Sequence, residues 1–364
     1  EYVGAWRDLF GYKHADMSEA HLRELVQAKA RVMKERGDGY SAWVLDQLGI
    51  ETMLANRVAM GRGLVEARFR WVPFDDALLF PLNNEAAKRS NSDVRGFYAS
   101  EERLLKRYMA DAAVGALPQT FDAYLSKVVT PTLERQRRGG AVAIKFEAAY
   151  LRPLDFSSGS RDEARRTYER YARGGEPAPA EYKALQDFLF RFVAGEAGRL
   201  GMAVHLHMGA GAGSYFSLAG SNPILLEPVL NDPTLRKTNF VLVHGGWPWV
   251  KETAFLLGKP NVYADFSSQT FLLPPRQLSE TLRTWLETYP EKILFGTDAF
   301  ALTPEVGWEE VAWLSSTTAR RALTAALAGM MSDGEITRER ALELARMTLR
   351  GNALKLYGFK EQQK

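Results

Sequence analysis

Short apolar runs alternate along this chain with amphipathic stretches of helical period, and this alternation limits the possible folds most strongly. Seven runs are predicted to form strands: 51–56, 69–73, 141–148, 203–207, 240–244, 262–265 and 292–296. Alternating strands and helices are typical of a parallel sheet whose helices lie outside it. We therefore expect an α/β fold, a (β/α)₈ TIM barrel with helical insertions, whose first strand is missing from this chain.

The predicted helices separate these strands. The first, at 18–36, begins with a capping sequence, Asp16-Met-Ser-Glu19. The others are predicted at 121–138, 161–173, 180–200, 248–257, 275–288, 308–331 and 337–350. No break in composition demands a second domain, so we expect a single domain over residues 1–364 with a helical insertion around 155–200.

The composition excludes several classes of function. A formal charge of +3 over 364 residues gives no indication of nucleic-acid or anionic-membrane binding. The chain has no cysteine, which rules out disulfides, thiolate zinc sites and cysteine nucleophiles. No apolar run approaches the roughly 20 residues of a membrane span. We expect a soluble, cytoplasmic protein with a small-molecule substrate as its partner, and leave a homo-oligomer open.

Three predicted strands end at residues that can bind a metal or move a proton. They lie in Met202-Ala-Val-His-Leu-His-Met-Gly209, Phe240-Val-Leu-Val-His-Gly-Gly-Trp247 and Ile293-Leu-Phe-Gly-Thr-Asp298. The chain has five histidines, and three of them lie in these segments. In a parallel barrel such strand ends converge on one mouth, where the chemistry takes place. This pattern predicts a metal-hydrolase site.

Strand alternation places His205 and His207 on the same face, so that together they could chelate one ion. His207 is nearer the strand end and is the favoured ligand. His205 is either a second ligand or an interior histidine that hydrogen-bonds to a neighbour. The glycine-rich loop that follows, 209–213, would allow backbone or substrate to approach closely.

His244 and Asp298 also end predicted strands. A neutral imidazole at 244 could bind metal or polarise a carbonyl, and a protonated one could hold an oxyanion; the alternative is a packed histidine. A carboxylate at 298 could bind the metal and exchange a proton with its water, or cap the next helix. Asp75 and Asp76, just past the second predicted strand, are further candidates for the mouth.

Lys145 and Glu147 share a face of an apolar strand, where an unpaired lysine is costly to bury. Lys145 is expected to pair with Glu147 or Asp298, to bind a substrate carboxylate, or to carry a carbamate that bridges two metals; a purely structural ion pair is the alternative. Arg152 is a candidate clamp for a substrate anion, or a surface residue. Trp247 is expected to line the substrate pocket or to pack.

With these motifs the sequence resembles the amidohydrolase superfamily, specifically its amidohydrolase-related branch, and most of all the barrel domain fused to glutamine-synthetase-like proteins. The resemblance covers most of residues 40–358. It is carried by these motifs, in order: Lys145-Phe-Glu-Ala-Ala-Tyr-Leu-Arg152, His205-Leu-His-Met-Gly-Ala-Gly211, Ser-Asn-Pro at 221–223, His244 to Pro248, 260–266, Gly-Thr-Asp at 296–298, and the closing 351–358.

The resemblance implies His207 as the fifth-strand metal ligand and His244 as the sixth-strand ligand or carbonyl polariser. It implies Asp298 as the eighth-strand ligand and general base. Lys145 stands at the fourth strand, where relatives have a carbamylated lysine or an unmodified residue. His205 departs from the pattern, because relatives often have glutamine there. The implied cofactor is a divalent metal, zinc before manganese.

A second departure concerns the front of the chain. The first strand of this family ends in Asp-x-His-x-His and supplies two metal ligands, yet the sequence has no such motif. The first predicted helix is the one expected after that strand. We therefore expect that the polypeptide begins earlier than Glu1, and that the ligands completing the site lie there.

The leading functional hypothesis is a metal-dependent hydrolase of a small carboxylate-bearing amide or lactone, with a metal-activated water and Asp298 as general base. His244 would stabilise developing charge, while Lys145 or Arg152 would orient the substrate. Two other enzyme classes of the superfamily stay open, a non-oxidative decarboxylase and a sugar-acid isomerase. The non-enzymatic alternative is a ligand-binding barrel with a degenerate site.

Overall fold

The structure is a computed structural model that describes residues 1–359. The chain divides into two compact units. We call the first the helical unit; it comprises residues 1–55, 59–70 and 265–354. The second, the sheet unit, comprises residues 56–58 and 71–264 together with the described residues from 355 onward.

Parallel strands form the centre of the sheet unit, in the order β3 (Ala143–Phe146), β4 (Ala203–His207), β5 (Phe240–Val243) and β6 (Val262–Asp265). Every residue of β3, β4 and β5 is buried, as expected for strands covered on both faces. The chain from β2 (Phe69–Val72) to the residues just after it runs parallel to the β3 segment, through bridges from Trp71 to Ala141 and from Phe74 to Lys145.

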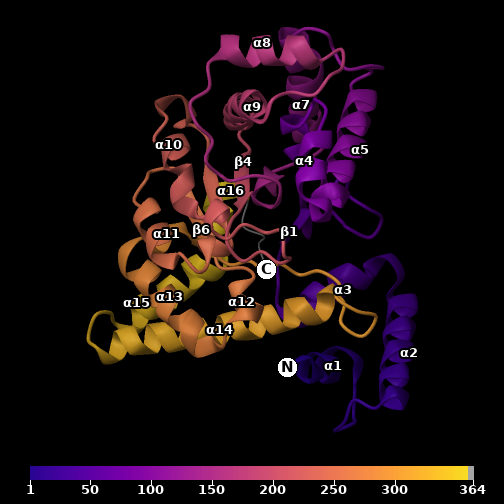
Figure 1. The fold of residues 1–364 in the computed structure, drawn as a ribbon. Coiled ribbons are helices and arrows are strands. Elements are labelled where there is room, and N and C mark those ends of the chain that lie inside the picture. Colours follow the sequence, from indigo (N-terminus) through magenta and orange to yellow (C-terminus); the bar gives the residue numbers. More distant parts are fainter. Residues whose placement is uncertain (360–364) are drawn as a thin grey trace. The chain divides into compact units, whose positions relative to one another are not determined.

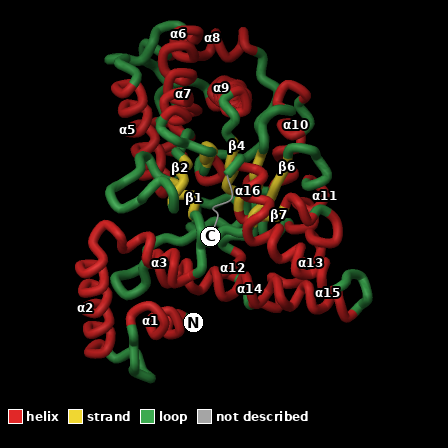
Figure 2. Tube along the Cα trace, turned by 180° about the vertical axis from the view of Figure 1, so that it is seen from behind, coloured by secondary structure: helices red, strands yellow, loops and turns green. Residues whose placement is uncertain are grey.

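Helices cover this sheet. They are α4 (Glu85–Ser90), α5 (Arg95–Asp111), α6 (Phe121–Tyr124), α7 (Thr130–Arg138), α8 (Arg161–Tyr171), α9 (Pro179–Arg199), α10 (Glu227–Leu230) and α11 (Val250–Leu256). The long helix α9 starts with a proline in its first turn, where the missing N–H costs nothing, and packs on β4 and α8. Figure 1 shows α8 lying across α9, and in Figure 2 the yellow strand β4 lies below α9.

The helical unit contains α1 (Tyr2–Phe10), α2 (Glu19–Arg36), α3 (Tyr40–Leu48), α12 (Gln269–Leu272), α13 (Pro275–Thr288), α14 (Trp308–Ser332) and α15 (Arg338–Arg346), with the short strand β7 (Ile293–Leu294). Two further elements, β1 (Met53–Asn56) and α16 (Asn352–Tyr357), run from one unit into the other. The ends of α2 and α14 are fixed by polar groups: the Ser18 hydroxyl accepts from His21 N, and Glu310 accepts from Gly307 N. A buried ion pair joins Lys29 of α2 to Glu310 of α14 at 2.7 Å.

Each of the seven predicted strands contains an observed one, and the α/β class with a parallel sheet is confirmed. The predicted insertion around 155–200 consists of α8 and α9. The predicted helix 121–138 is interrupted, because residues Leu125–Val129 form a π-helical turn between α6 and α7. The unpredicted helices are α1, α3, α4, α5, α10, α12 and α16. Across residues 1–359, no helix has the length and apolarity needed to cross a bilayer.

Candidate active site

The carboxyl ends of β3, β4 and β5 bring four predicted site residues into the sheet unit. Lys145 on β3 is the register partner of His205 on β4. His207 closes β4 beside Val243, and His244 follows β5 directly. These four side chains are buried, with 2% to 7% of their surface exposed. The polar residues of three strand ends therefore lie inside the unit, as the barrel hypothesis expects.

His207 and His244 form the most informative contact of this site. Nδ1 of His207 lies 3.0 Å from Nε2 of His244, so one of these nitrogens donates its proton to the other. The second ring nitrogen of His207, Nε2, is buried and has no hydrogen-bond partner among the described residues. Burial, followed by the neighbouring His244 and Lys145, lowers the pKa of His207 well below its ordinary value. The ring is therefore neutral near pH 7, the form in which imidazole binds metals.

Aromatic rings enclose His207. The centroid of the Tyr150 ring lies 4.6 Å from the centroid of the His207 ring, and Phe216 meets His207 edge-on at 5.9 Å. Tyr150 comes from the segment after β3, and Phe216 comes from the segment after β4. Two loops at the same end of the sheet thus hold the imidazole in place.

His205 is used differently from His207. Its Nε2 lies 2.8 Å from the hydroxyl of Tyr357 at the end of α16. Burial, followed by the charge of Lys145, lowers the pKa of His205 to about 3, so this ring is also neutral. Of the two roles left open by the sequence, the contact with Tyr357 favours an interior histidine that hydrogen-bonds to a neighbour. Its role as a metal ligand stays a prediction.

Four carboxyl groups interact beside Lys145. Both oxygens of Asp76 accept from the backbone N–H of Glu147, at 2.9 and 2.8 Å. Burial, followed by the charge of Glu101, raises the pKa of Asp76 well above its ordinary value, while Lys145 opposes this effect. Burial also raises the pKa of Glu101 to about 7, with contributions from Glu147 and Asp75. Asp76 is therefore the electrostatic partner that the structure shows for Lys145.

Residues with left-handed backbone angles mark the ends of four strands. In the sheet unit they are Ala210 (φ 40°) after β4 and His244 (φ 65°) after β5. In the helical unit they are Ser268 (φ 56°) and Asp298 (φ 49°), which follow β6 and β7. Such angles are costly for residues other than glycine and cluster at functional sites. This strain is a second, independent indication that the strand ends carry function.

A close backbone approach joins the loops after β4 and β5. Ala210 N donates to Trp247 O at 2.9 Å, and a Cβ added to Gly209 would lie 2.1 Å from that same oxygen. Gly209 also has a φ of 55°, so glycine is required there for two reasons. Trp247 itself is half-buried and precedes a cis proline, Pro248. Its backbone oxygen therefore links the loops that carry His207 and His244.

Asp298 lies in the helical unit. Its carboxyl oxygen Oδ2 accepts from the Ser268 hydroxyl at 2.5 Å, and the side chain is half-buried. The preceding residue, Thr297, is fixed through its carbonyl oxygen, which accepts from Ser315 of α14 at 2.9 Å. The Asp298 carboxylate is thus held from the segment after β6, and the backbone just before it is held from α14. Asp298 does not cap a helix, since α14 starts at Trp308.

Arg152 is buried in the sheet unit and paired. Its Nη2 lies 2.5 Å from Asp187 Oδ1 of α9, and its Nη1 donates to Gln186 Oε1. Its Cζ lies 4.3 Å from the centroid of the Phe156 ring. The sequence predicted an anion clamp or a surface residue. The surface alternative is wrong, because the side chain is buried and its charge is balanced by Asp187. The role as an anion clamp stays a prediction.

The polar groups of the site fit a divalent metal in part. His207 Nε2 fits, because it is neutral, buried, oriented by His244 and without another partner. A complete ligand set is not present: among residues 1–359, no group of three His, Asp or Glu side chains is placed to hold a metal ion. The described residues thus supply one well-prepared donor to a metal site.

A profile of the amidohydrolase family matches residues 105–359, more than half of the chain. The chain belongs to the amidohydrolase family. The match includes β3 to β7 and with them the candidate residues from Lys145 to Asp298, whereas Asp75, Asp76 and Glu101 precede it. This finding confirms the resemblance to the amidohydrolase superfamily, whereas the closer likeness to the barrel domain fused to glutamine-synthetase-like proteins stays a prediction.

Comparisons with individual proteins place this amidohydrolase more loosely. It is 28% identical over 264 residues to the protein fluG of Emericella nidulans, covering 69% of this chain but only 29% of fluG. The chain therefore spans less than a third of that relative.

Two solved structures have a similar fold at low identity. One is a Lactobacillus casei protein described as a metal-dependent hydrolase (17% identical, TM-score 0.67, covering 98% of this chain and 84% of that one). The other is uronate isomerase from Thermotoga maritima (16% identical, TM-score 0.66, covering 97% and 77%). At such identities the likeness concerns the fold, and it agrees with the predicted barrel class.

Some functional groups of the amidohydrolase gave little or no signal in the sequence. Glu101 lies on the unpredicted helix α5, far from the strand ends in the sequence. Tyr150 and Tyr357, which contact His207 and His205, appeared only as parts of family motifs. Asp75 and Asp76 were visible as acids after a strand, and the structure places both in the buried acidic group.

Proposed function

We propose that this amidohydrolase is a metal-dependent hydrolase of a small carboxylate-bearing amide or lactone, with His207 as a metal ligand. The observation that supports this most is the buried, unpartnered Nε2 of His207, whose other ring nitrogen contacts His244. A bound zinc or manganese ion would supply Lewis acidity toward the substrate carbonyl.

The chain's own residues would orient and move protons around that carbonyl. His244 contacts Nδ1 of His207 and so orients its ring; in the tautomer in which His207 Nδ1 donates this hydrogen bond, Nε2 would keep its lone pair for the metal. Lys145, buried beside Asp76, is the proposed partner of the substrate carboxylate. Asp298, oriented by Ser268, is the proposed proton acceptor. Glu147 and Trp247 are proposed substrate contacts, whereas Arg152 is committed to Asp187.

The test is a substrate screen on the full-length native protein, with N-acyl amino acids, simple amides and lactones as substrates. We expect hydrolysis of at least one class, and a loss of roughly 10³-fold or more in kcat for Asp298→Asn, since the proton acceptor is removed. The matched control is Asp162→Asn, which changes an exposed aspartate of α8 and should leave kcat unchanged.

The same screen separates the alternatives. Release of carbon dioxide from a carboxylate substrate would indicate a non-oxidative decarboxylase. Conversion of a uronate to the corresponding keto sugar acid would indicate a sugar-acid isomerase. Either result, or hydrolysis that survives Asp298→Asn, would overturn the hydrolase proposal. A protein that binds carboxylate ligands without turning them over would indicate the non-catalytic barrel.

A further inference from the structure

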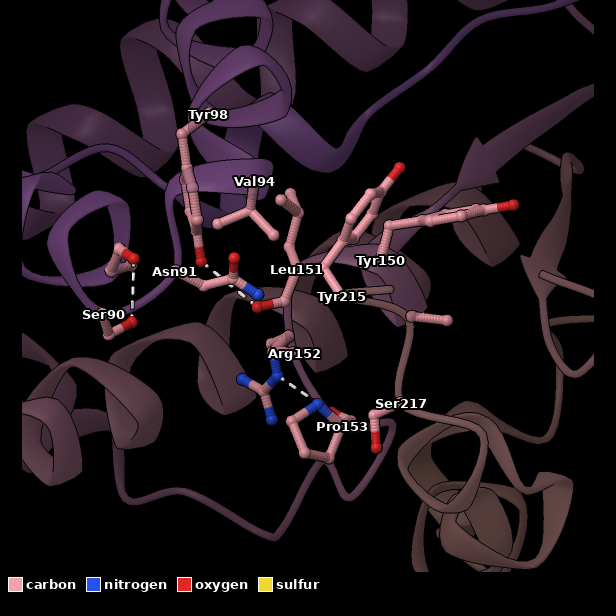
Figure 3. Close-up of a pocket in the computed structure, with 12 residues that line it drawn as sticks. Ser90, Asn91, Val94, Tyr98, Tyr150, Leu151, Arg152, Pro153, Tyr215 and Ser217 are labelled. Carbon is pink, nitrogen blue, oxygen red and sulfur yellow. Dashed lines mark hydrogen bonds between the residues drawn. The ribbon is translucent and has the colours of Figure 1, made fainter. Parts of the chain in front are cut away.

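A small cavity opens in the sheet unit next to the segment that carries Tyr150. It has a volume of about 180 Å³ and lies among α4, α5 and the segments after β3 and β4 (Figure 3). For comparison, an engineered apolar cavity of about 150 Å³ in another protein binds benzene. The space is therefore that of a single six-membered ring.

Aromatic and aliphatic side chains form much of the wall. Tyr98 and Val94 come from α5 and the turn before it, and Tyr150 and Leu151 follow β3 (Figure 3). Tyr215 completes the wall, with its ring centroid 6.5 Å from that of Tyr150 and the planes inclined at 48°. Aromatic rings pack best in inclined or offset arrangements, so these walls suit a further aromatic ring.

The polar groups of the cavity are neutral or already neutralised. Arg152 is the one charged residue among those lining it, and its guanidinium is paired with Asp187 at 2.5 Å. The Tyr98 hydroxyl donates to Leu151 O at 3.2 Å. Burial raises the pKa of Tyr98 to about 12, so this phenol is uncharged near neutral pH. A charged ligand would find no unpaired counter-charge there, which favours a neutral one.

Tyr150 connects this cavity to the candidate active site. Tyr150 is one of the residues that line the cavity, and its ring centroid lies 4.6 Å from that of His207. The Tyr150 ring is further held by stacking on Phe97, with centroids 5.4 Å apart and an interplanar angle of 13°. The cavity is thus bounded by a residue whose ring contacts the proposed metal ligand His207.

We propose that this cavity binds a neutral aromatic ring and that it is the specificity pocket for an aromatic group of the substrate. The second half of the proposal rests on the proposed hydrolase function; the first half does not. The substrate class becomes an amide or lactone with an uncharged aromatic substituent, in addition to the carboxylate assigned to Lys145.

Ring binding is tested with phenol as the probe, by saturation-transfer NMR on the full-length protein without added metal. Ala87→Trp places an indole in the cavity from α4, whereas Ala86→Trp changes the neighbouring half-buried residue, which does not line it. We expect phenol to bind the parent protein and Ala86→Trp alike and at least tenfold more weakly to Ala87→Trp. Cyclohexanol, a saturated ring of similar size, should bind more weakly than phenol to the parent protein.

A second variant guards against misfolding of Ala87→Trp. Tyr215→Ala removes one aromatic wall without adding bulk and should weaken phenol binding by at least threefold. No phenol binding by the parent protein, or equal binding by Ala87→Trp and Ala86→Trp, would overturn the pocket.

The link to catalysis has its own readout. Once a hydrolysed substrate is known, Ala87→Trp should raise KM for aromatic substrates at least tenfold and leave KM for aliphatic ones unchanged. Phenol binding without any hydrolysis would refute the proposed function and keep the ring site. Hydrolysis with equal KM changes for both substrate types would refute the specificity role alone.

Discussion

His244 Nε2 lies 3.0 Å from His207 Nδ1, and this contact determines which nitrogen of His207 remains for a ligand. His244 reaches this position with a φ of 65°, between Val243 at the end of β5 and the glycines 245 and 246. The chain thus accepts a strained backbone at the residue that orients the neighbouring imidazole. Such strain is retained where the surrounding structure gains from it.

Replacing His244 tests this orienting role. His244→Asn keeps a residue that tolerates left-handed backbone angles, but its shorter side chain leaves His207 Nδ1 without its partner. We expect the affinity for zinc to fall by roughly 10–100-fold, the usual effect of losing a group that orients a ligating histidine. Isothermal titration with zinc measures it. An unchanged affinity would show that His244 does not position His207.

Gly209 tests the close approach of the two loops. Gly209→Ala would place a Cβ 2.1 Å from Trp247 O at a φ of 55°. Gly201→Ala is the control, because Gly201 has a φ of 69° but no neighbouring atom within 4 Å of an added Cβ. Backbone strain should lower the free energy of unfolding of both variants by about 1 kcal/mol. In Gly209→Ala the clash should lower it by a further ~1–3 kcal/mol. Urea unfolding measures both; equal losses would argue against a tight contact between the loops.

Asp75 makes stability depend on pH. Burial raises its pKa from 3.8 to about 7, although the Gln136 hydrogen bond opposes this. At a pH between 3.8, the ordinary pKa, and about 7, the folded chain keeps a proton on Asp75 that the unfolded chain has lost. The free energy of unfolding therefore falls as the pH rises through this range.

Asp75→Asn removes that ionisation and keeps an oxygen that can accept from Gln136. The free energy of unfolding of the variant, relative to that of the parent protein, should rise by roughly 2–3 kcal/mol from pH 5 to pH 8. Urea unfolding at the two pH values measures the gain, with the exposed Asp162→Asn as control. If the difference in free energy of unfolding between variant and parent is the same at pH 5 and pH 8, Asp75 is ionised in the folded protein at both pH values.

The buried ion pair of Lys29 and Glu310 should contribute strongly to the stability of the helical unit. Lys29→Met would leave the Glu310 carboxylate buried without its cation, at a cost of about 3–5 kcal/mol. Adding Glu310→Gln should recover part of this loss, because the uncompensated charge is then gone. Lys34→Met, at an exposed position of the same helix, is the control. A double variant less stable than Lys29→Met would contradict this account.

The sequence predicted the strands well because they are short apolar runs that end at recognisable polar residues. β4 and β6 were predicted to the residue, and His207 was correctly expected at a strand end. The helix α5 was missed because its buried residues are interleaved with arginines, glutamates and a lysine. The sequence pattern was sufficient to predict an element wherever burial of that element requires a continuous apolar run.

Contacts between distant residues were beyond prediction. The partner of Arg152 is Asp187, 35 residues further along, and that of His205 is Tyr357, 152 residues further along. No spacing rule links such positions, since they meet only after the sheet and its helices have packed. The contact between His207 and His244 likewise depends on a left-handed backbone angle at His244, which is uncommon for residues other than glycine.

The most direct test of the central claim is the metal content of the full-length native protein and its His207→Ala variant, measured by inductively coupled plasma mass spectrometry after gel filtration. We predict about one equivalent of zinc or manganese per chain in the parent protein and nearly none in His207→Ala. The control variant His14→Ala, which changes a half-buried histidine of the helical unit, should keep the parent value. A metal-free parent protein, or a His207→Ala variant that retains its metal, would contradict the account.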